Sequence, residues 1–170
     1  MYRMKVLFVC TGNLCRSPMA EALLRTVLER RGCDGVVVSS AGTWADYGNS
    51  ATSEAQEAVA ARGADLSEHR SRPVTDDELA GADVVVAMTS VHLREIEELA
   101  PEVMEKVVLL KELAEIEVAE DGLRSLLAGK RPAPRRDLDV DDPIGLPFGA
   151  YERCCKELEA GVTRLAEVLC

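Results

Sequence analysis

Residues 4–18 of the chain read MKVLFVCTGNLCRSP. The unbroken apolar run at 6–9 is typical of a strand that is covered on both faces. The run ends at Cys10, and a short glycine-containing loop leads to Ser17 and Pro18. Serine can cap a helix and proline loses no hydrogen bond at the first helical position, so this pair predicts a helix start. The order strand, loop, helix predicts an anion-binding arrangement with a thiol at its mouth.

Apolar strand-like runs alternate with helical patterns along most of the chain. Further strands are predicted at residues 36–39, 83–88 and 107–110. Apolar spacing and capping signals predict helices over residues 17–32, 52–63, 90–99 and 151–169, with a short helix opening at 75. This alternation indicates an α/β fold, a three-layer sandwich in which helices cover both faces of a four-stranded parallel sheet. Ligands of such folds bind at the carboxyl ends of the strands, where the loop after Cys10 lies.

The chain has 170 residues, a length that fits one domain over residues 1–170. Residues 113–139 interrupt the alternation and are interpreted as an insertion in that domain. A further helix fits residues 113–129. The run KRPAPRR at 130–136 is interpreted as a basic, proline-broken surface linker.

The chain is acidic, with 30 Asp and Glu against 20 Lys and Arg and a net charge of -10. This balance argues against nucleic acid or an anionic membrane as partner, and an anionic substrate would need a local positive site. No apolar run approaches the roughly 20 residues of a membrane helix. Residues 1–13 lack the pattern of a signal peptide. We therefore expect a cytoplasmic protein, and no pattern in the sequence decides its oligomeric state.

The six cysteines do not have the spacing of a zinc site, and only two histidines accompany them. We therefore expect no metal site, and reduced, partly buried thiols. Two of the six differ from the others, because Cys10 and Cys15 bracket the glycine-containing loop. The cysteines are Cys10, Cys15, Cys33, Cys154, Cys155 and Cys170, and the histidines are His69 and His92.

The loop between Cys10 and Arg16 has five residues, enough to turn its backbone N–H groups toward a central anion. The helix start aims its positive end at the same point, and the Arg16 guanidinium can hold two phosphate oxygens. Such surroundings lower the pKa of a thiol from about 8.5 and produce a thiolate suited to attack phosphorus. The predicted phosphate-binding residues are Thr11, Gly12, Asn13, Leu14, Cys15, Arg16 and Ser17.

Three neighbours in the loop have more specific expected roles. Gly12 permits the positive φ that such a turn requires. Asn13 tolerates a left-handed conformation and can brace the loop with its side chain. Ser17 can donate a hydrogen bond to the Cys10 sulfur. Taken singly, a cysteine at a strand end is usually a small core residue and an arginine is usually in a surface ion pair, but the joint pattern favours a reactive site.

The stretch VLFVCTGNLCRSPMAEALLR at residues 6–25 resembles the signature of the low-molecular-weight protein-tyrosine phosphatases. Weaker similarities are SAGT at 40–43, DLSEHRSR at 65–72, ADVVVAM at 82–88 and the dipeptide Asp142-Pro143. The resemblance implies that Cys10 is the nucleophile, Arg16 the phosphate clamp, Ser17 the thiolate stabiliser and Asp142 the general acid. It also implies a phosphorylated protein as substrate and no metal or organic cofactor.

The residue that supplies the proton is less sharply defined by the sequence itself. Residues 137–143, DLDVDDP, offer four carboxylates, and repulsion among them would raise the pKa of one into the range of an acid. The chemistry alone does not choose among them. Only the resemblance, which places the acid before Pro143, selects Asp142.

The walls of the site bear on the substrate. Leu14, Trp44 and Ile144 are the predicted substrate-binding residues, and Trp44 offers a stacking surface. A bacterial subgroup that acts on phosphoarginine shares CTGNxCRSP and AMTxxH, the latter at residues 87–92, but has threonine where this chain has Leu14. We therefore expect a phosphotyrosine phosphatase with a phosphocysteine intermediate, and protein-arginine phosphatase is the alternative.

Four further hypotheses remain open at this point. Cys15 could trap an oxidised Cys10 as a Cys10–Cys15 disulfide and so silence the enzyme reversibly. An arsenate reductase would need more cysteines near the third strand, and residues 80–100 contain none. A phosphocysteine carrier would need neither an arginine clamp nor a hydrolytic acid, and this chain has candidates for both. A phosphate-binding domain without turnover is the last alternative.

Overall fold

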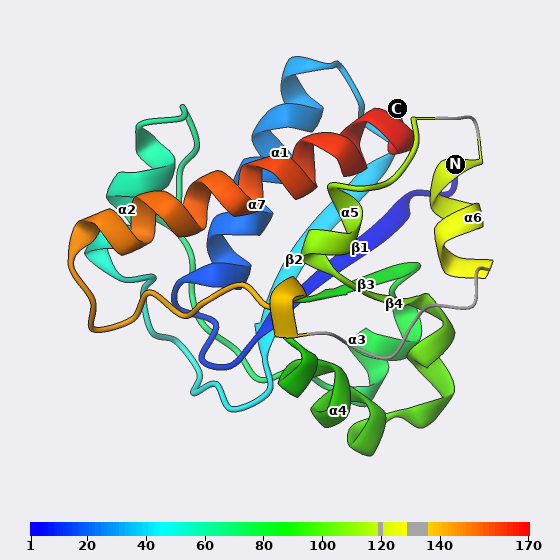
Figure 1. The fold of residues 1–170 in the computed structure, drawn as a ribbon, viewed down its shortest axis with the longest axis horizontal. Coiled ribbons are helices and arrows are strands. Elements are labelled where there is room, and N and C mark those ends of the chain that lie inside the picture. Colours follow the sequence, from blue (N-terminus) through cyan, green and yellow to red (C-terminus); the bar gives the residue numbers. More distant parts are fainter. Residues whose placement is uncertain (119–120, 129–135) are drawn as a thin grey trace.

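The computed structural model describes residues 1–118, 121–128 and 136–170. Its centre is a parallel sheet of four strands in the order β2-β1-β3-β4 (Figure 1). This confirms the predicted α/β sandwich and its four-stranded parallel sheet. The strands are β1 (Met4–Cys10), β2 (Val36–Gly42), β3 (Val84–Ala87) and β4 (Val107–Leu109).

Helices cover both faces of the sheet, as the continuous apolar strands predicted. Phe8 of β1 points into one core, whereas its neighbours Leu7 and Val9 point into the other. The first core is shared with α1 (Arg16–Arg30), α2 (Ser53–Ala60), α5 (Leu110–Leu113), α6 (Gly122–Ala128) and α7 (Phe148–Leu169). The second is shared with α3 (Asp76–Gly81), α4 (Ser90–Leu99) and the 3₁₀ helix η1 (Pro101–Lys106). A second 3₁₀ helix, η2, spans Arg136–Leu138.

Helices α2 and α3 begin at the predicted caps, Thr52 and Thr75. The Thr75 hydroxyl accepts from the Glu78 backbone N–H and the Glu78 carboxylate accepts from Thr75 N–H, which is a complete capping box. The Thr52 side chain caps α2 by accepting from Ala55 N–H. Thr89, a cap that was not predicted, accepts from His92 N–H at the start of α4.

The predicted start of the first helix is wrong by two residues. Helix α1 begins at Arg16 and its N-cap residue is Cys15, which makes no side-chain capping bond. Ser17 lies inside the first turn, because its hydroxyl is used by the preceding loop instead of by the helix N-terminus.

The segment predicted to add a helix over 113–129 contains no single helix of that length. Helix α5 ends at Leu113, and α6 begins only at Gly122, where a Cβ would lie 2.4 Å from the carbonyl oxygen of Glu117. Of the basic run at 130–136, residues 130–135 lie outside the described residues. One domain over residues 1–170 and an insertion at 113–139 stay predictions.

Two cysteines depart from the expectation of reduced thiols. Cys33 follows α1 and Cys170 ends α7, and the two are joined in a disulfide with a Cα–Cα distance of 6.0 Å. Helices α1 and α7 pack against each other, which brings together two residues that are 137 positions apart in the sequence. The other four cysteines are free and buried.

The strand order places the loop after β1 at the switch point of the sheet. The chain crosses from β1 to β2 on one side, and then passes back over β1 to β3 on the other side (Figure 1). Crevices for ligands form at such points, at the carboxyl ends of the strands. Within the described ranges, none of the helices combines the length and the apolar character needed to span a bilayer.

Candidate active site

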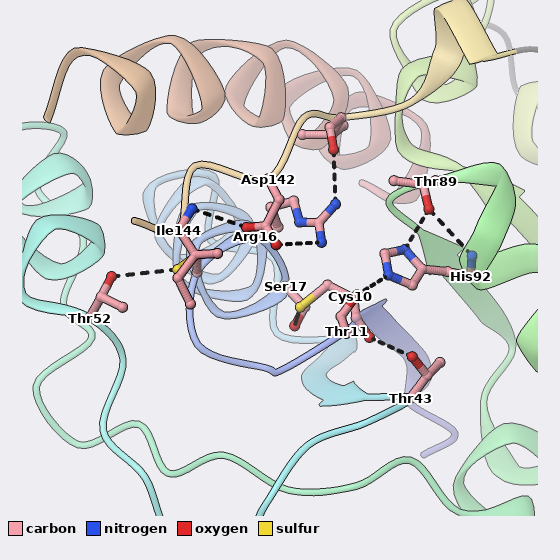
Figure 2. Close-up of polar contacts among 12 residues, drawn as sticks. Cys10, Thr11, Arg16, Ser17, Thr43, Thr52, Thr89, His92, Asp142 and Ile144 are labelled. Atoms are coloured by element: carbon pink, nitrogen blue, oxygen red, sulfur yellow. Dashed lines mark hydrogen bonds and ion pairs between the residues drawn. The ribbon is translucent and has the colours of Figure 1, made fainter. Parts of the chain in front are cut away.

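The thiol of Cys10 lies at the carboxyl end of β1, directly above the first turn of α1 (Figure 2). Its Sγ is 2.9 Å from the Ser17 hydroxyl oxygen. That hydroxyl also accepts a hydrogen bond from the Asn13 side-chain amide, at 2.9 Å, and its single proton can be donated either to the Cys10 sulfur or to the carbonyl oxygen of Ala41, 3.4 Å away. Cys10 is 2% exposed, and the adjacent N-terminus of α1 favours an anion at this position. The predicted contact between Ser17 and the Cys10 sulfur is therefore present in the structure.

Asn13 gives the loop its shape. It is the one non-glycine residue with positive φ (55°) in the described part of the chain, and it is fully buried. Its amide donates to Ser17 and Ser40 Oγ, and its side-chain oxygen accepts from Arg72 N–H. The His69 ring nitrogen Nε2 lies 2.8 Å from the Asn13 carbonyl oxygen. The predicted bracing role is met.

The prediction that Gly12 supplies the left-handed turn is wrong. Gly12 is not among the glycines with positive φ, because Asn13 makes the turn and holds it with its own side-chain bonds. Sequence reasoning favoured the glycine for its missing side chain. The fixed network around the amide lets an asparagine occupy the strained position instead.

The end of β2 packs closely against the loop and holds it through backbone hydrogen bonds. A Cβ on Gly42 would lie 2.3 Å from the Thr11 carbonyl oxygen, so only glycine fits there. The next two residues bond the loop directly: Thr43 N–H donates to Cys10 O and Trp44 N–H to Thr11 O, both at 2.9 Å. The SAGT segment thus supports the loop through its backbone.

Arg16 is buried at 5% exposure, and its guanidinium lies beside the loop. One terminal nitrogen donates to the carbonyl oxygen of Val140 at 2.9 Å, and the other lies 3.3 Å from Asp142 Oδ2 (Figure 2). The backbone contact fixes the plane of the guanidinium. A guanidinium offers paired N–H donors of the kind that can bind an oxyanion in a bidentate manner.

The structure separates the acidic residues of the 137–143 segment. Asp142 forms an ion pair with Arg16, and its side chain is 43% exposed. Its Oδ1 also accepts a hydrogen bond from the backbone N–H of Ile144 at 3.2 Å. Asp139 instead accepts from the backbone N–H of Ser90 at 2.7 Å, where α4 begins. Asp142 is thus the carboxylate that the fold brings to the arginine, with access to solvent.

A buried histidine belongs to this site, and its contacts could not be derived from the sequence. His92 is 1% exposed and lies between two threonines: Nε2 is 2.8 Å from Thr11 Oγ1, and Nδ1 is 3.0 Å from Thr89 Oγ1 (Figure 2). Burial, together with the nearby Arg16 charge, lowers the pKa of His92 from 6.5 to about 3. The usable signal was the AMTxxH stretch, in which a threonine cap is followed three residues later by histidine.

The three predicted wall residues border the loop from different elements. Leu14 is a partly buried loop residue, and Ile144, 49% exposed, follows Asp142. Trp44 is 77% exposed, and its indole N–H donates to Glu95 Oε1 of α4 at 3.2 Å. Two further exposed apolar residues on these same segments, Tyr47 and Leu146, were missed, because exposure cannot be read from an apolar residue in a loop.

Cys15 lies in the loop but faces away from solvent. It is 4% exposed, and its sulfur lies 3.6 Å from Thr52 Oγ1 and 3.7 Å from the Tyr151 hydroxyl oxygen, to which the thiol donates. Burial raises the pKa of Cys15 and raises that of Tyr151 to about 12. The Cys10–Cys15 disulfide trap is untested by these contacts and stays a prediction.

No cluster of three or more His, Cys, Asp or Glu side chains suited to a metal ion occurs in residues 1–118, 121–128 and 136–170. The side chains at the site include a thiol, a guanidinium, a carboxylic acid and several hydroxyls. A thiol at a helix N-terminus beside a guanidinium can attack an anionic phosphorus centre, and the carboxyl group can transfer a proton.

The chain is similar to known protein phosphatases over nearly its whole length. The family model described as low molecular weight phosphotyrosine protein phosphatase matches residues 5–170. A protein-arginine-phosphatase of Geobacillus stearothermophilus is 37% identical over 97% of this chain and 95% of its own length. A low molecular weight protein-tyrosine phosphatase A of Mycobacterium bovis is 40% identical over 94% of this chain and 88% of its own length.

A solved structure of the YwlE arginine phosphatase is also similar to this chain. It is a cysteine-to-serine mutant with a phosphorylated active-site serine. It has a TM-score of 0.77 and 36% sequence identity, and the match covers 96% of this chain and 93% of that one.

Proposed function

Because the chain belongs to the low molecular weight phosphotyrosine protein phosphatase family, we propose that it dephosphorylates protein side chains through a phosphocysteine on Cys10. The observation that carries this proposal is the joint position of three groups at the N-terminus of α1. The Cys10 sulfur lies 2.9 Å from the Ser17 hydroxyl, and the buried Arg16 guanidinium is already oriented by Val140 O. These groups stabilise a sulfur anion and a bound dianion at the same point.

In the first step the Cys10 thiolate attacks phosphorus. An S–P bond forms, and the bond from phosphorus to the substrate oxygen or nitrogen breaks. The Ser17 hydroxyl stabilises the thiolate beforehand. Backbone N–H groups of the loop and Arg16 bind the phosphoryl oxygens, and their donors outweigh the repulsion between thiolate and phosphate.

Asp142 supplies the proton that the leaving group needs. It then takes a proton from the water that hydrolyses the phosphocysteine, which breaks the S–P bond and releases phosphate. Two contacts support this assignment: Asp142 lies 3.3 Å from the arginine that binds the phosphate, and its side chain is open to solvent. A bound phosphoryl group competes with Asp142 for the Arg16 nitrogen, so substrate binding releases the carboxyl group for proton transfer.

The walls of the site favour an aromatic leaving group. Leu14 contributes apolar surface from the loop, and Trp44 and Ile144 are exposed on two other segments, one after β2 and one after Asp142. Aromatic and aliphatic surfaces around a phosphate cradle fit a phenyl ring better than a charged side chain. Phosphotyrosine is therefore the substrate that we favour.

Phosphoarginine is the second candidate, and a specific observation supports it. The 37% identity to a protein-arginine-phosphatase extends over nearly the whole of both chains. The same cysteine chemistry would break a P–N bond, with Asp142 protonating the guanidine nitrogen. Arsenate reductase and a phosphocysteine carrier are less well supported, because family membership favours hydrolysis and residues 80–100 contain no relay cysteine.

The activity itself is tested with p-nitrophenyl phosphate. Wild-type protein should hydrolyse it and Cys10→Ala should not. Cys155→Ser, a change at a buried cysteine of α7, should retain activity. Loss of activity in both variants, or in neither, would contradict the assigned nucleophile.

The substrate class is tested by comparing kcat/KM on matched phosphotyrosine and phosphoarginine peptides. We expect the wild type to prefer phosphotyrosine and Leu14→Thr to shift the ratio toward phosphoarginine. Leu14→Ile, which keeps an apolar wall, should leave the ratio unchanged. A wild-type preference for phosphoarginine would reverse our choice, and an unchanged ratio in Leu14→Thr would show that this position does not set selectivity.

A further inference from the structure

His92 has contacts that the proposed reaction does not account for. It is a fully enclosed polar side chain on α4, a helix whose other buried residues, Leu93 and Ile96, serve the core. Its ring spans the gap between the start of α4 and the phosphate-binding loop. One nitrogen meets Thr89 and the other meets Thr11, the residue next to the nucleophile.

Hydrogen-bond accounting favours one tautomer of the ring. Thr89 Oγ1 already accepts the capping bond from the His92 backbone N–H, at 3.3 Å. Its own proton is therefore best used by donation to Nδ1, 3.0 Å away. If Nδ1 accepts, the ring proton is on Nε2 and is donated to Thr11 Oγ1, at 2.8 Å.

The other tautomer would serve the site less well. With the proton on Nδ1, Thr89 Oγ1 would accept two bonds and Thr11 would have to donate its hydroxyl proton to the ring. That proton would then be unavailable to an anion. A bound dianion attracts every hydroxyl proton within reach, so an occupied loop favours the Nε2–H form.

We propose that His92 is a positioning residue of the phosphate-binding loop: its Nε2–H donates to Thr11 Oγ1 and so leaves the Thr11 hydroxyl proton for the phosphoryl group. Thr11 is exposed at the mouth of the loop, whereas its backbone carbonyl is held by Trp44 N–H at 2.9 Å. His92 thus holds the side chain of Thr11, and the backbone N–H of Trp44 holds its carbonyl group. The proposal rests on the proposed function only in naming a phosphoryl group as the anion.

A neutral ring suits this position. Arg16 is the charged group whose field reaches His92, and an imidazolium there would repel the guanidinium that must bind the phosphate. A neutral imidazole with its proton on Nε2 offers a donor to the loop without adding a second positive charge inside the protein. Histidine does this more rigidly than glutamine, because its ring has only two rotatable bonds.

The first test reads the tautomer directly. Long-range ¹H–¹⁵N NMR on wild-type protein with inorganic phosphate should show Nε2 of His92 protonated and Nδ1 unprotonated. His92→Gln identifies the signals by their loss. A proton on Nδ1 in the phosphate-saturated protein would overturn the proposal.

The second test separates positioning from folding. His92→Leu keeps bulk but removes the donor, His92→Gln keeps an amide donor, and Thr11→Val removes the hydroxyl. We expect phosphate affinity, measured by calorimetry, to fall about 2- to 10-fold in His92→Leu and in Thr11→Val, the loss expected for one hydrogen bond. His92→Gln should recover most of the affinity.

The double variant decides between coupled and independent effects. His92→Leu combined with Thr11→Val should bind phosphate no more weakly than either single variant. Multiplying losses, or no recovery in His92→Gln, would refute the proposal. If His92→Leu does not fold, the tautomer read by NMR on the wild-type protein with phosphate decides the proposal instead. Phosphate binding does not require turnover, so these outcomes stay distinct from a failure of the phosphatase proposal.

Discussion

Acidification should destabilise this protein because His92 is held neutral in the folded state, and His92→Gln should remove that part of the destabilisation. The histidine is held neutral by burial and by Arg16, with its pKa lowered from 6.5 to about 3. In the unfolded chain it titrates normally and takes up a proton below about pH 6.5. Between these two values the unfolded state binds more protons than the folded state, so stability rises with pH and falls on acidification.

The size of the effect follows from the two pKa values. Near pH 5 the unfolded histidine is almost fully protonated and the folded one is not, which lowers the free energy of unfolding by about 2 kcal/mol relative to pH 8. His92→Gln has no such group. Its free energy of unfolding should therefore lose about 2 kcal/mol less than that of the wild type over the same interval, whatever its stability at pH 8.

Urea denaturation of both proteins at several pH values between 5 and 8 measures this difference. The other titrating groups are common to both proteins and cancel in the comparison. Parallel stability curves would refute the reasoning, because they would mean that His92 takes up its proton equally readily in the folded and unfolded states.

Three further predictions concern the acid and the other cysteines. Asp142→Asn should lower kcat by about 10²- to 10⁴-fold in steady-state assays, and less for substrates with good leaving groups, whereas Asp141→Asn should change little; equal losses would contradict the assigned acid. After peroxide treatment, added thiol should restore activity to the wild type but not to Cys15→Ser; recovery in both would exclude the Cys10–Cys15 disulfide. Without reductant, Cys170→Ser should have a free energy of unfolding about 2–4 kcal/mol lower than the wild type in denaturant titrations, and with reductant the two proteins should be equally stable. A difference that persists with reductant would mean that the cysteine contributes through packing and not through the disulfide.

The fold was predictable because its signals are local. The apolar run ending at Cys10 shows where a covered strand stops, and the alternation of such runs with capped helices indicates a parallel sheet. The position of the loop at the carboxyl edge of that sheet then follows from topology alone. Arg16 and Ser17 could be proposed for the same reason, since both follow Cys10 closely in the sequence, at the start of the next helix.

The remaining features depend on contacts between distant segments, which no local pattern encodes. The choice of Asp142 depends on which carboxylate reaches Arg16, and Asp139 is taken instead by the start of α4. His92 needs Thr11, 81 residues away, to acquire its role. The Cys33–Cys170 disulfide exists because two helices pack, and the left-handed turn is at Asn13 because its amide finds partners on β2 and beyond.

The central claim is a covalent bond between the sulfur of residue 10 and phosphorus. Asp142→Asn should accumulate this species, because it retains the nucleophile and lacks the base that activates water. Rapid quenching during turnover of p-nitrophenyl phosphate, followed by peptide mass spectrometry, should find the phosphoryl group on Cys10, and Cys10→Ala should carry none. A phosphoryl group on another residue, or undiminished turnover in Cys10→Ala, would contradict the account.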